Sequence, residues 1–419
     1  MAAVLAGLLL PVSAALAGGP LSVSSAGAPI VWSTAAPIAY RTDNGPLGAI
    51  VTEAQARARV LAMFNVWQNV TTASIAYART GTISNTGVFT DGDVSTVPEY
   101  DAVNTDCANG VQNPIIYDAA AAIFIDLGVD ETSVIGFAGP CNFDATRITS
   151  ANAVMNGLFQ DGVDSPTNPE LPAALFDATF VHEFGHFSGL DHSQINVNCL
   201  GFCGADDLEG LPTMFPFLVD VSMGILSDDD KAWISRLYPQ TGAGTTFANT
   251  HGTITGTVFF SDGLSHTQGV NVIARRVDTG TNQDRTNAVS VVSGFKFTSN
   301  LGQSVTANYL PCTPASSCPP NGFFDDNSGG SFSGSRQSGD IGFFEISVPS
   351  GFAYTVELES IDASFESGSS VGPLSPPIPM PGTAPAPVTT AVVNANTVIS
   401  VGGLVLIGTD PRFDQFEGP

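Results

Sequence analysis

Residues 171–193 read LPAALFDATFVHEFGHFSGLDHS and hold three of the five histidines in this 419-residue chain. Their apolar pattern predicts one long helix, and Gly189 marks its end because glycine readily adopts the left-handed backbone that closes a helix. His182 and His186 are four residues apart, so both rings project from one face of that helix, about one turn apart. A sharp turn at Gly189 lets His192 swing back towards them.

This spacing predicts a catalytic zinc site. Three neutral imidazoles leave the fourth tetrahedral position open, whereas structural zinc sites are closed by four protein ligands. Glu183 lies beside a ligand, so its carboxylate can take a proton from water that the metal activates. A bare HExxH motif arises by chance, but coincidence at all five fixed positions is on the order of a few in a million. We therefore predict one Zn²⁺ held by His182, His186 and His192, with Glu183 as general base.

The extended motif resembles that of the metzincin zinc metallopeptidases, and Ser193 after the third histidine is similar to their matrixin-like branch. LPTMFP at residues 211–216 resembles the family's Met-turn, which makes Met214 the methionine beneath the zinc ligands. LSDDDKAWISRLYP at residues 226–239 predicts a short helix with Ser227 as its N-cap and three aspartates in the first turn, which favour the helix dipole. It resembles the helix that closes the family's catalytic domain. The resemblance covers residues 30–240 and implies an α+β domain with a twisted sheet and a zinc-binding active-site helix.

The function that the resemblance implies is a secreted zinc-dependent endopeptidase. It would hydrolyse peptide bonds of extracellular proteins by zinc-activated water, and its partners would be protein or peptide substrates. Residues 147–157, RITSANAVMNG, resemble the edge strand on which a substrate adds as a further strand. The expected pocket for the side chain after the scissile bond is apolar and is lined by Phe215, Pro216, Phe217 and Leu218.

The chain also departs from the family. Residues 194–210 add a loop between His192 and the Met-turn, and Pro216 stands where astacin-like relatives carry a tyrosine ligand. No cysteine-bearing propeptide lies between residues 17 and 30, so the family's thiol latch is absent. The aspartates allow structural Ca²⁺, but no calcium site can be located from the sequence.

Composition limits the partners. The chain has 13 Lys and Arg against 39 Asp and Glu, a net charge of −26, which argues against binding nucleic acid or anionic membranes. Residues 1–17 form a short apolar run ending in Ala15-Leu16-Ala17, which indicates a signal peptide and secretion. No Lys or Arg precedes that run, and the alternative is a buried N-terminal helix. No later segment has the apolar length of a membrane span.

The even number of cysteines in an exported chain indicates disulfides. We predict pairing between neighbours in the sequence, although six cysteines allow 15 connectivities. A structural zinc site at Cys199 and Cys203 is the competing interpretation, but no second cysteine pair lies close by. The cysteines are Cys107, Cys141, Cys199, Cys203, Cys312 and Cys318.

The remainder of the N-terminal half predicts a mixture of strands and helices, typical of an α/β-type domain. Residues 52–70 should form a helix capped by Thr52, with Trp67 on its apolar stripe. Residues 73–80 and 120–128 read as buried strands. The acidic stretch at residues 91–106 is interpreted as a solvated connection, with calcium binding as the alternative.

A Gly/Thr/Asn-rich linker at residues 241–251 separates this half from short alternating runs that predict an all-β sandwich at residues 252–410. These runs resemble the carboxypeptidase regulatory-like domain found beside many secreted peptidases. Further linkers and insertions are expected at residues 18–29, 300–340 (Gly/Ser/Asp-rich), 373–388 (Pro-rich) and 411–419 (acidic tail). His251 and His266 are expected to be surface residues.

Two other functions are compatible with the motif. An extracellular binding or adhesion protein could carry a degenerate peptidase-like domain, although the intact Glu183 argues against this. An enzyme acting on glycans or esters could use the same zinc geometry, but no feature of the sequence supports it.

Overall fold

The computed structural model describes residues 19–22, 29–84, 87–144, 147–193, 195, 210–242, 244–267, 269–277, 287–294, 331–332, 342–361, 374–375 and 380–408. The predicted signal peptide, the acidic tail and nearly all of the 300–340 insertion lie outside the described residues. So do four of the cysteines, Cys199, Cys203, Cys312 and Cys318. Within the part that is described, the fold is mixed α/β with several sheets, and no helix is long and apolar enough to cross a membrane.

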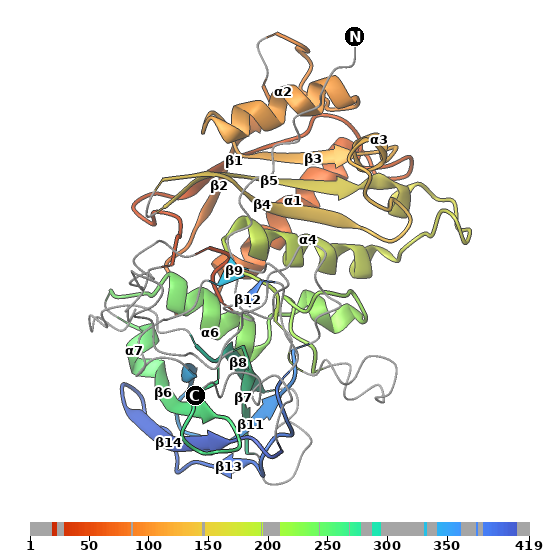
Figure 1. Ribbon diagram of the computed structural model, residues 1–419. Helices are drawn as coiled ribbons and strands as arrows, with labels where there is room; N and C mark the ends of the chain where they lie inside the picture. Colours follow the sequence, from red (N-terminus) through yellow and green to blue (C-terminus); the bar gives the residue numbers. More distant parts are fainter. Residues whose placement is uncertain are drawn as a thin grey trace, which may run out of the picture.

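A five-stranded sheet with strand order β2-β1-β3-β5-β4 forms the N-terminal half (Figure 1). Its strands are β1 (Ile38–Thr42), β2 (Tyr77–Thr82), β3 (Pro114–Asp118), β4 (Gly136–Phe143) and β5 (Ile148–Asn156). β1 pairs in parallel with β2 and β3, and β3 in parallel with β5, whereas β4 runs antiparallel to β5. β4 is therefore an edge of the sheet.

Residues 147–157 form a strand as predicted, but it is not itself the edge strand that the resemblance implied. β5 lies between β3 and β4, and its residues are almost all buried. The true edge strand reads GFAGPCNF, and its glycines and proline give it little strand propensity, which is why the sequence did not reveal it.

Helices cover both faces of this sheet (Figure 1). They are α1 (Glu53–Gln68), α2 (Val97–Ala108), α3 (Ala122–Asp126) and α4 (Ala173–Phe187), and a 3-10 turn, η1 (Gly157–Gln160), follows β5. Along β3, Ile115 joins the core that includes α1 and α4, whereas Ile116 joins a second core with α2 and α3. This alternation is the period of two expected of a strand that is buried on both sides.

The helix predicted at residues 52–70 is confirmed as α1. Thr52 caps it in a reciprocal capping box with Gln55. Phe64 and Trp67, at most 2 % exposed, lie on its buried stripe.

Two other assignments in this half were wrong. Residues 120–128, expected as a strand, contain the short helix α3, and the buried strand is β3 just before it. Within the acidic stretch 91–106, expected to be a solvated connection, α2 begins after Thr96, which forms a capping box with Glu99. The sequence of α2 does contain local signals for a helix, namely the capping box and a proline in the first turn. α3 contains neither, because its N-cap is Ala121 without a side-chain hydrogen bond.

Beyond residue 250, every described element is a strand. They are β6 (His251–Phe259), β7 (Asn271–Arg276), β8 (Ala288–Val292), β9 (Ser331–Phe332), β10 (Phe343–Pro349), β11 (Tyr354–Glu359), β12 (Leu374–Ser375), β13 (Val388–Thr389) and β14 (Val398–Val405). They form a three-stranded sheet β10-β6-β14, a four-stranded sheet β13-β11-β7-β8 and the pair β12-β9. Side chains from both larger sheets, such as Ile254 and Val272, belong to the same core as the N-terminal half.

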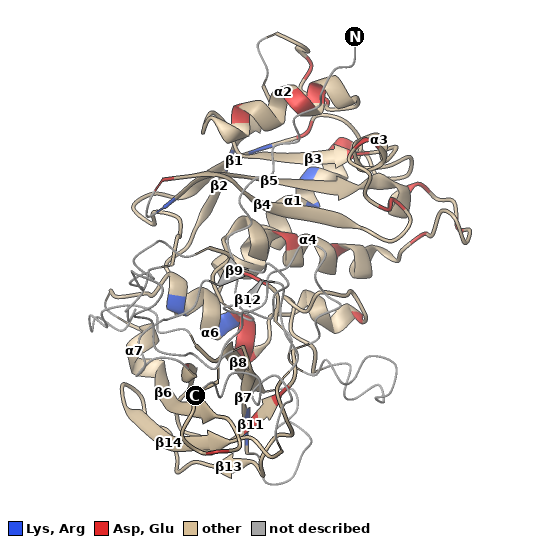
Figure 2. Ribbon diagram, viewed as in Figure 1, with Lys and Arg blue, Asp and Glu red and all other residues tan. Residues whose placement is uncertain are grey.

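Between the two halves lie η3 (Val221–Gly224), α6 (Asp228–Leu237) and α7 (Phe247–Thr250). α6 was predicted, and its capping by Ser227 is confirmed. α7 falls within the expected linker, and His251, expected at the surface, is 6 % exposed because its ring stacks on Phe247. Acidic residues occur along α2, α4, α6 and the loops, and basic residues are few in the described part of the chain (Figure 2).

Candidate metal centre

Helix α4 carries the first two histidines and is buried on nearly every side. The ring of Phe184 stacks on Phe64 of α1 with 3.7 Å between the ring centroids. The indole of Trp67 donates a hydrogen bond of 2.8 Å to the carbonyl of Val181. The helix ends as predicted, because Gly189 has a φ of +86°, in the left-handed region.

The turn after α4 is held from outside the helix. Residues 19–22, part of the expected linker at 18–29, pair with it in antiparallel fashion. Leu21 donates its N–H to the carbonyl of Gly189 at 2.7 Å, and Asp191 donates to the carbonyl of Gly19 at 2.9 Å. The backbone leading to His192 is therefore fixed on both sides.

The structure brings the three predicted ligands together. Nε2 of His182 lies 3.1 Å from Nε2 of His186 and from Nε2 of His192, and the last two atoms are 3.0 Å apart. Nδ1 of His182 donates to the carbonyl of Thr213 at 2.7 Å, and Nδ1 of His186 donates to the carbonyl of Leu190 at 2.8 Å. Since Nδ1 carries the ring proton in both, their Nε2 atoms present lone pairs to a common point.

These imidazoles are in the neutral form that binds metal. Burial lowers the pKa of His182 to about 4. Burial, with the neighbouring His182, lowers the pKa of His186 to about 3, and burial also brings the pKa of His192 well below its ordinary value. Two nitrogens bound to one zinc ion in tetrahedral geometry are about 3.3 Å apart, close to the spacing found here. The group His182, His186 and His192 could therefore bind a metal ion.

Met214 lies against the same helix. It is 2 % exposed, and a Cβ on Gly185 would come within 2.2 Å of its sulfur, so only glycine fits between the two ligands of α4. The backbone carbonyl of Met214 accepts the N–H of Ser193 at 2.7 Å. Met214, which was predicted to lie beneath the ligands, therefore contacts α4 and is hydrogen-bonded to the segment that carries His192.

Glu183 is 5 % exposed, and its Oε2 has no hydrogen-bond partner among the described residues. Burial raises its pKa to about 8. Its Cγ would lie 3.1 Å from a Cβ on Gly136, the first residue of β4, so the carboxyl stands beside the edge strand. A buried carboxyl without a partner is costly, and such groups concentrate at functional sites.

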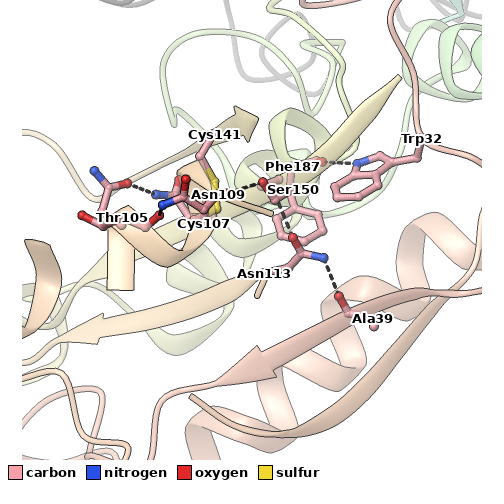
Figure 3. Close-up of a disulfide and its surroundings, with 12 residues drawn as sticks. Trp32, Ala39, Thr105, Cys107, Asn109, Asn113, Cys141, Ser150 and Phe187 are labelled. Atoms are coloured by element: carbon pink, nitrogen blue, oxygen red, sulfur yellow. Dashed lines mark hydrogen bonds between the residues drawn. A yellow bond between two sulfur atoms is a disulfide. The ribbon is translucent and has the colours of Figure 1, made fainter. Parts of the chain in front are cut away.

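The far end of β4 is anchored by the disulfide Cys107–Cys141, which confirms one predicted pairing (Figure 3). Cys107 is in α2, and its carbonyl accepts the hydroxyl of Ser150 in β5. The edge strand beside Glu183 is thereby tied to the helix on the opposite face of the sheet.

The four expected pocket residues differ in their burial. Phe215 is fully buried and packs with Leu211 and Met223 in a small core. Phe217 is 45 % exposed, and Pro216 and Leu218 are half-buried. The last three are accessible to a ligand, whereas Phe215 supports them from behind.

Two residues near the site were assigned only a helix-dipole role from the sequence. Asp229 and Asp230 are each 1 % exposed, although both lie in the first turn of α6. Asp230 accepts the backbone N–H groups of Thr213 at 2.9 Å and Met214 at 3.0 Å. The one available signal was the spacing Ser227-x-x-Asp230, a capping box that turns the Asp230 side chain back towards the start of the helix.

Comparison with known proteins identified no relative: no family model and no curated protein matched the chain.

Proposed function

We propose that this protein is a secreted zinc-dependent endopeptidase whose N-terminal half has a metzincin, matrixin-like fold. The observation that carries the proposal is the convergence of three neutral imidazoles, one buried and two half-buried, beside a buried carboxyl that has no partner among the described residues. His182, His186 and His192 would hold one Zn²⁺, and Glu183 would be the general base.

Zinc bound there would polarise a peptide carbonyl and lower the pKa of water from 15.7 to about 7. In its ionised form Glu183, whose Oε2 has no partner among the described residues, would accept the proton from that water and deliver it to the departing amine. The nearly complete burial of the carboxyl strengthens its interactions, because the dielectric constant there is low.

A substrate would bind along β4 rather than along β5. β4 is the edge of the five-stranded sheet and passes Glu183 at Gly136, so an extended peptide can add to it through backbone hydrogen bonds. Because these hydrogen bonds involve only the backbone, such pairing tolerates many substrate sequences. The half-exposed, apolar Phe217 and Leu218 favour an apolar side chain after the scissile bond.

We also propose that the two larger sheets of the C-terminal half form a β-sandwich of the carboxypeptidase regulatory-like kind. Their shared core supports this arrangement. The role suggested by the resemblance is folding support, substrate docking or surface attachment.

The test is Glu183→Ala, measured for zinc content and for cleavage of casein. Because Glu183 is the base and not a ligand, the variant should keep one zinc per chain and lose on the order of 10³-fold in kcat/KM. Asp177→Asn is the matched control: Asp177 lies on the same helix and faces Arg59 at 3.6 Å, and we expect its activity to be unchanged. Persistent cleavage by Glu183→Ala would show that the assigned roles are wrong.

A further inference from the structure

Helix α6 covers the free edge of the four-stranded sheet. β8 is the edge strand, and the backbone N–H of Ser290 donates to Oδ1 of Asp229 at 2.7 Å. The carbonyl of the same residue accepts the indole N–H of Trp233 at 2.9 Å. An edge strand leaves such groups unpaired unless something covers them, so α6 satisfies both.

An ion pair secures the contact further along the helix. Arg236 is 3 % exposed and donates to the carbonyl of Glu345 in β10 at 2.8 Å and to its carboxylate at 2.7 Å. Both larger sheets of the C-terminal half are therefore bonded to α6.

The same helix contacts the segment that orients one candidate ligand and the segment that carries another. Asp230 accepts the N–H of Thr213, whose carbonyl holds Nδ1 of His182. The side chain of Asp229 also lies beside the hydroxyl of Ser193, the residue that follows His192. Two adjacent carboxyls thus support two different ligands, and only Asp229 is also bonded to the C-terminal half.

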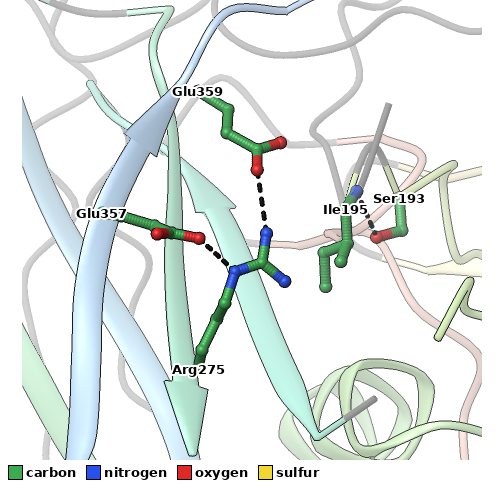
Figure 4. A network of polar contacts seen from close by, with 5 residues as sticks. All are labelled: Ser193, Ile195, Arg275, Glu357 and Glu359. Atoms are coloured by element: carbon green, nitrogen blue, oxygen red, sulfur yellow. Dashed lines mark hydrogen bonds and ion pairs between the residues drawn. The ribbon is translucent and has the colours of Figure 1, made fainter. Parts of the chain in front are cut away.

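A second contact joins the His192 segment to the C-terminal half. Ile195 is 1 % exposed and packs with Ile273 of β7 and Ala288 of β8. Figure 4 draws Ser193 and Ile195 together with Arg275 of β7 and its ion-pair partners on β11. The sheet therefore contacts the chain within three residues of the third ligand.

This support matters most for His192. The rings of His182 and His186 are each oriented by a hydrogen bond from Nδ1 to a backbone carbonyl. Nδ1 of His192 is buried and has no such partner among the described residues. The direction of this ring depends on its backbone, and therefore on what holds Ser193 and Ile195.

We propose that Asp229 is a positioning residue through which the C-terminal sheets hold His192 in place for metal binding. The inference rests on the metal site proposed above. It makes the C-terminal half a structural part of the metal centre.

The test compares Asp229→Ala with Asp228→Ala in the full-length, metal-stripped chain. Asp228 precedes Asp229 on the same turn and faces the charges of Lys231 and Arg276, so its loss leaves the Ser193 and Ser290 contacts intact. Zinc affinity is measured by competition with a chromophoric chelator, at a temperature where all variants are folded. Asp229→Ala should raise the zinc Kd about 10- to 100-fold, and Asp228→Ala should leave it within about threefold.

The absorption spectrum of the Co²⁺-substituted proteins provides a second readout, since it responds to ligand geometry and not to overall stability. We expect it to change in Asp229→Ala alone. If Asp229→Ala does not fold, Ser193→Ala removes only the hydroxyl and should weaken zinc binding about threefold to tenfold.

An unchanged Kd and cobalt spectrum in the Asp229 variant, or an unchanged Kd in the Ser193 variant where that one is used, would overturn the positioning role and leave the metal site standing. If the unsubstituted chain bound no zinc, the metal site itself would be wrong, and the inference with it.

Discussion

Two buried carboxyl groups on α4 and α6 differ in how they are satisfied. Asp230 accepts the N–H groups of Thr213, Met214 and Ser227 at 2.7–3.0 Å, and the Ser227 hydroxyl as well. Glu183, equally buried, has an Oε2 with no partner among the described residues. A buried carboxyl with hydrogen-bond partners stabilises the backbone around it. One without partners lowers the stability of the fold and is typical of functional sites. The comparison therefore favours a structural role for Asp230 and a catalytic role for Glu183.

The largest difference in stability should appear between variants in which each of these two carboxyl groups is removed. Asp230→Ala leaves three buried N–H groups without an acceptor, so we expect the free energy of unfolding to fall by about 3–5 kcal/mol. Burial raises the pKa of Glu183 to about 8, so its carboxyl is protonated in the metal-free protein at neutral pH. Glu183→Gln keeps this neutral form and its shape, and it should change the free energy of unfolding by less than about 1 kcal/mol while abolishing cleavage. Urea unfolding of both metal-free variants measures the difference.

Asp230→Asn sharpens the same comparison, because it retains one acceptor oxygen and should lose less stability than Asp230→Ala. A loss of stability in Glu183→Gln as large as that in Asp230→Ala would contradict the distinction between the two carboxyls.

The effect expected from pH is smaller when it is expressed per pH unit. Burial, together with the neighbouring Asp230, raises the pKa of Asp229 from 3.8 to about 8. The folded state thus binds this proton more tightly than the unfolded state, and the stabilisation is complete below about pH 4 and lost as the pH approaches 8. Stability should fall across this window by up to about 1.4 kcal/mol per pH unit.

Asp229→Asn, which resembles the protonated acid, isolates this contribution. Subtracting its stability from that of the unsubstituted, metal-free protein at each pH should give a difference that declines between pH 4 and pH 8. A flat difference would show that Asp229 has the same proton affinity in the folded and unfolded states.

Local spacing made the convergence of the three histidines predictable. His182, Glu183 and His186 lie on one helix, where the period of 3.6 residues fixes which side chains share a face. Gly189 and His192 follow within six residues, so their placement needs only one turn. The cap of α1 at Thr52 was predictable for the same reason, whereas the pairing of Cys107 with Cys141 was one choice among 15 connectivities, made because the two are neighbours in the sequence.

Contacts between distant segments were not predictable. The order of strands in the sheet depends on pairing across long separations, so β5 was taken for an edge and the glycine-rich β4 was missed. The bond between Asp229 and Ser290 joins residues 61 positions apart. From the sequence alone, an aspartate in the first turn of a helix is adequately explained by the helix dipole.

The most direct test of the central claim is the metal content of the purified chain, combined with cleavage of casein in the presence and absence of a chelator. The arrangement of His182, His186 and His192 predicts one zinc per chain and cleavage that stops when the metal is removed and returns when zinc is restored. A chain that contains no zinc, or one that cleaves casein equally well after the metal is removed, would contradict the account.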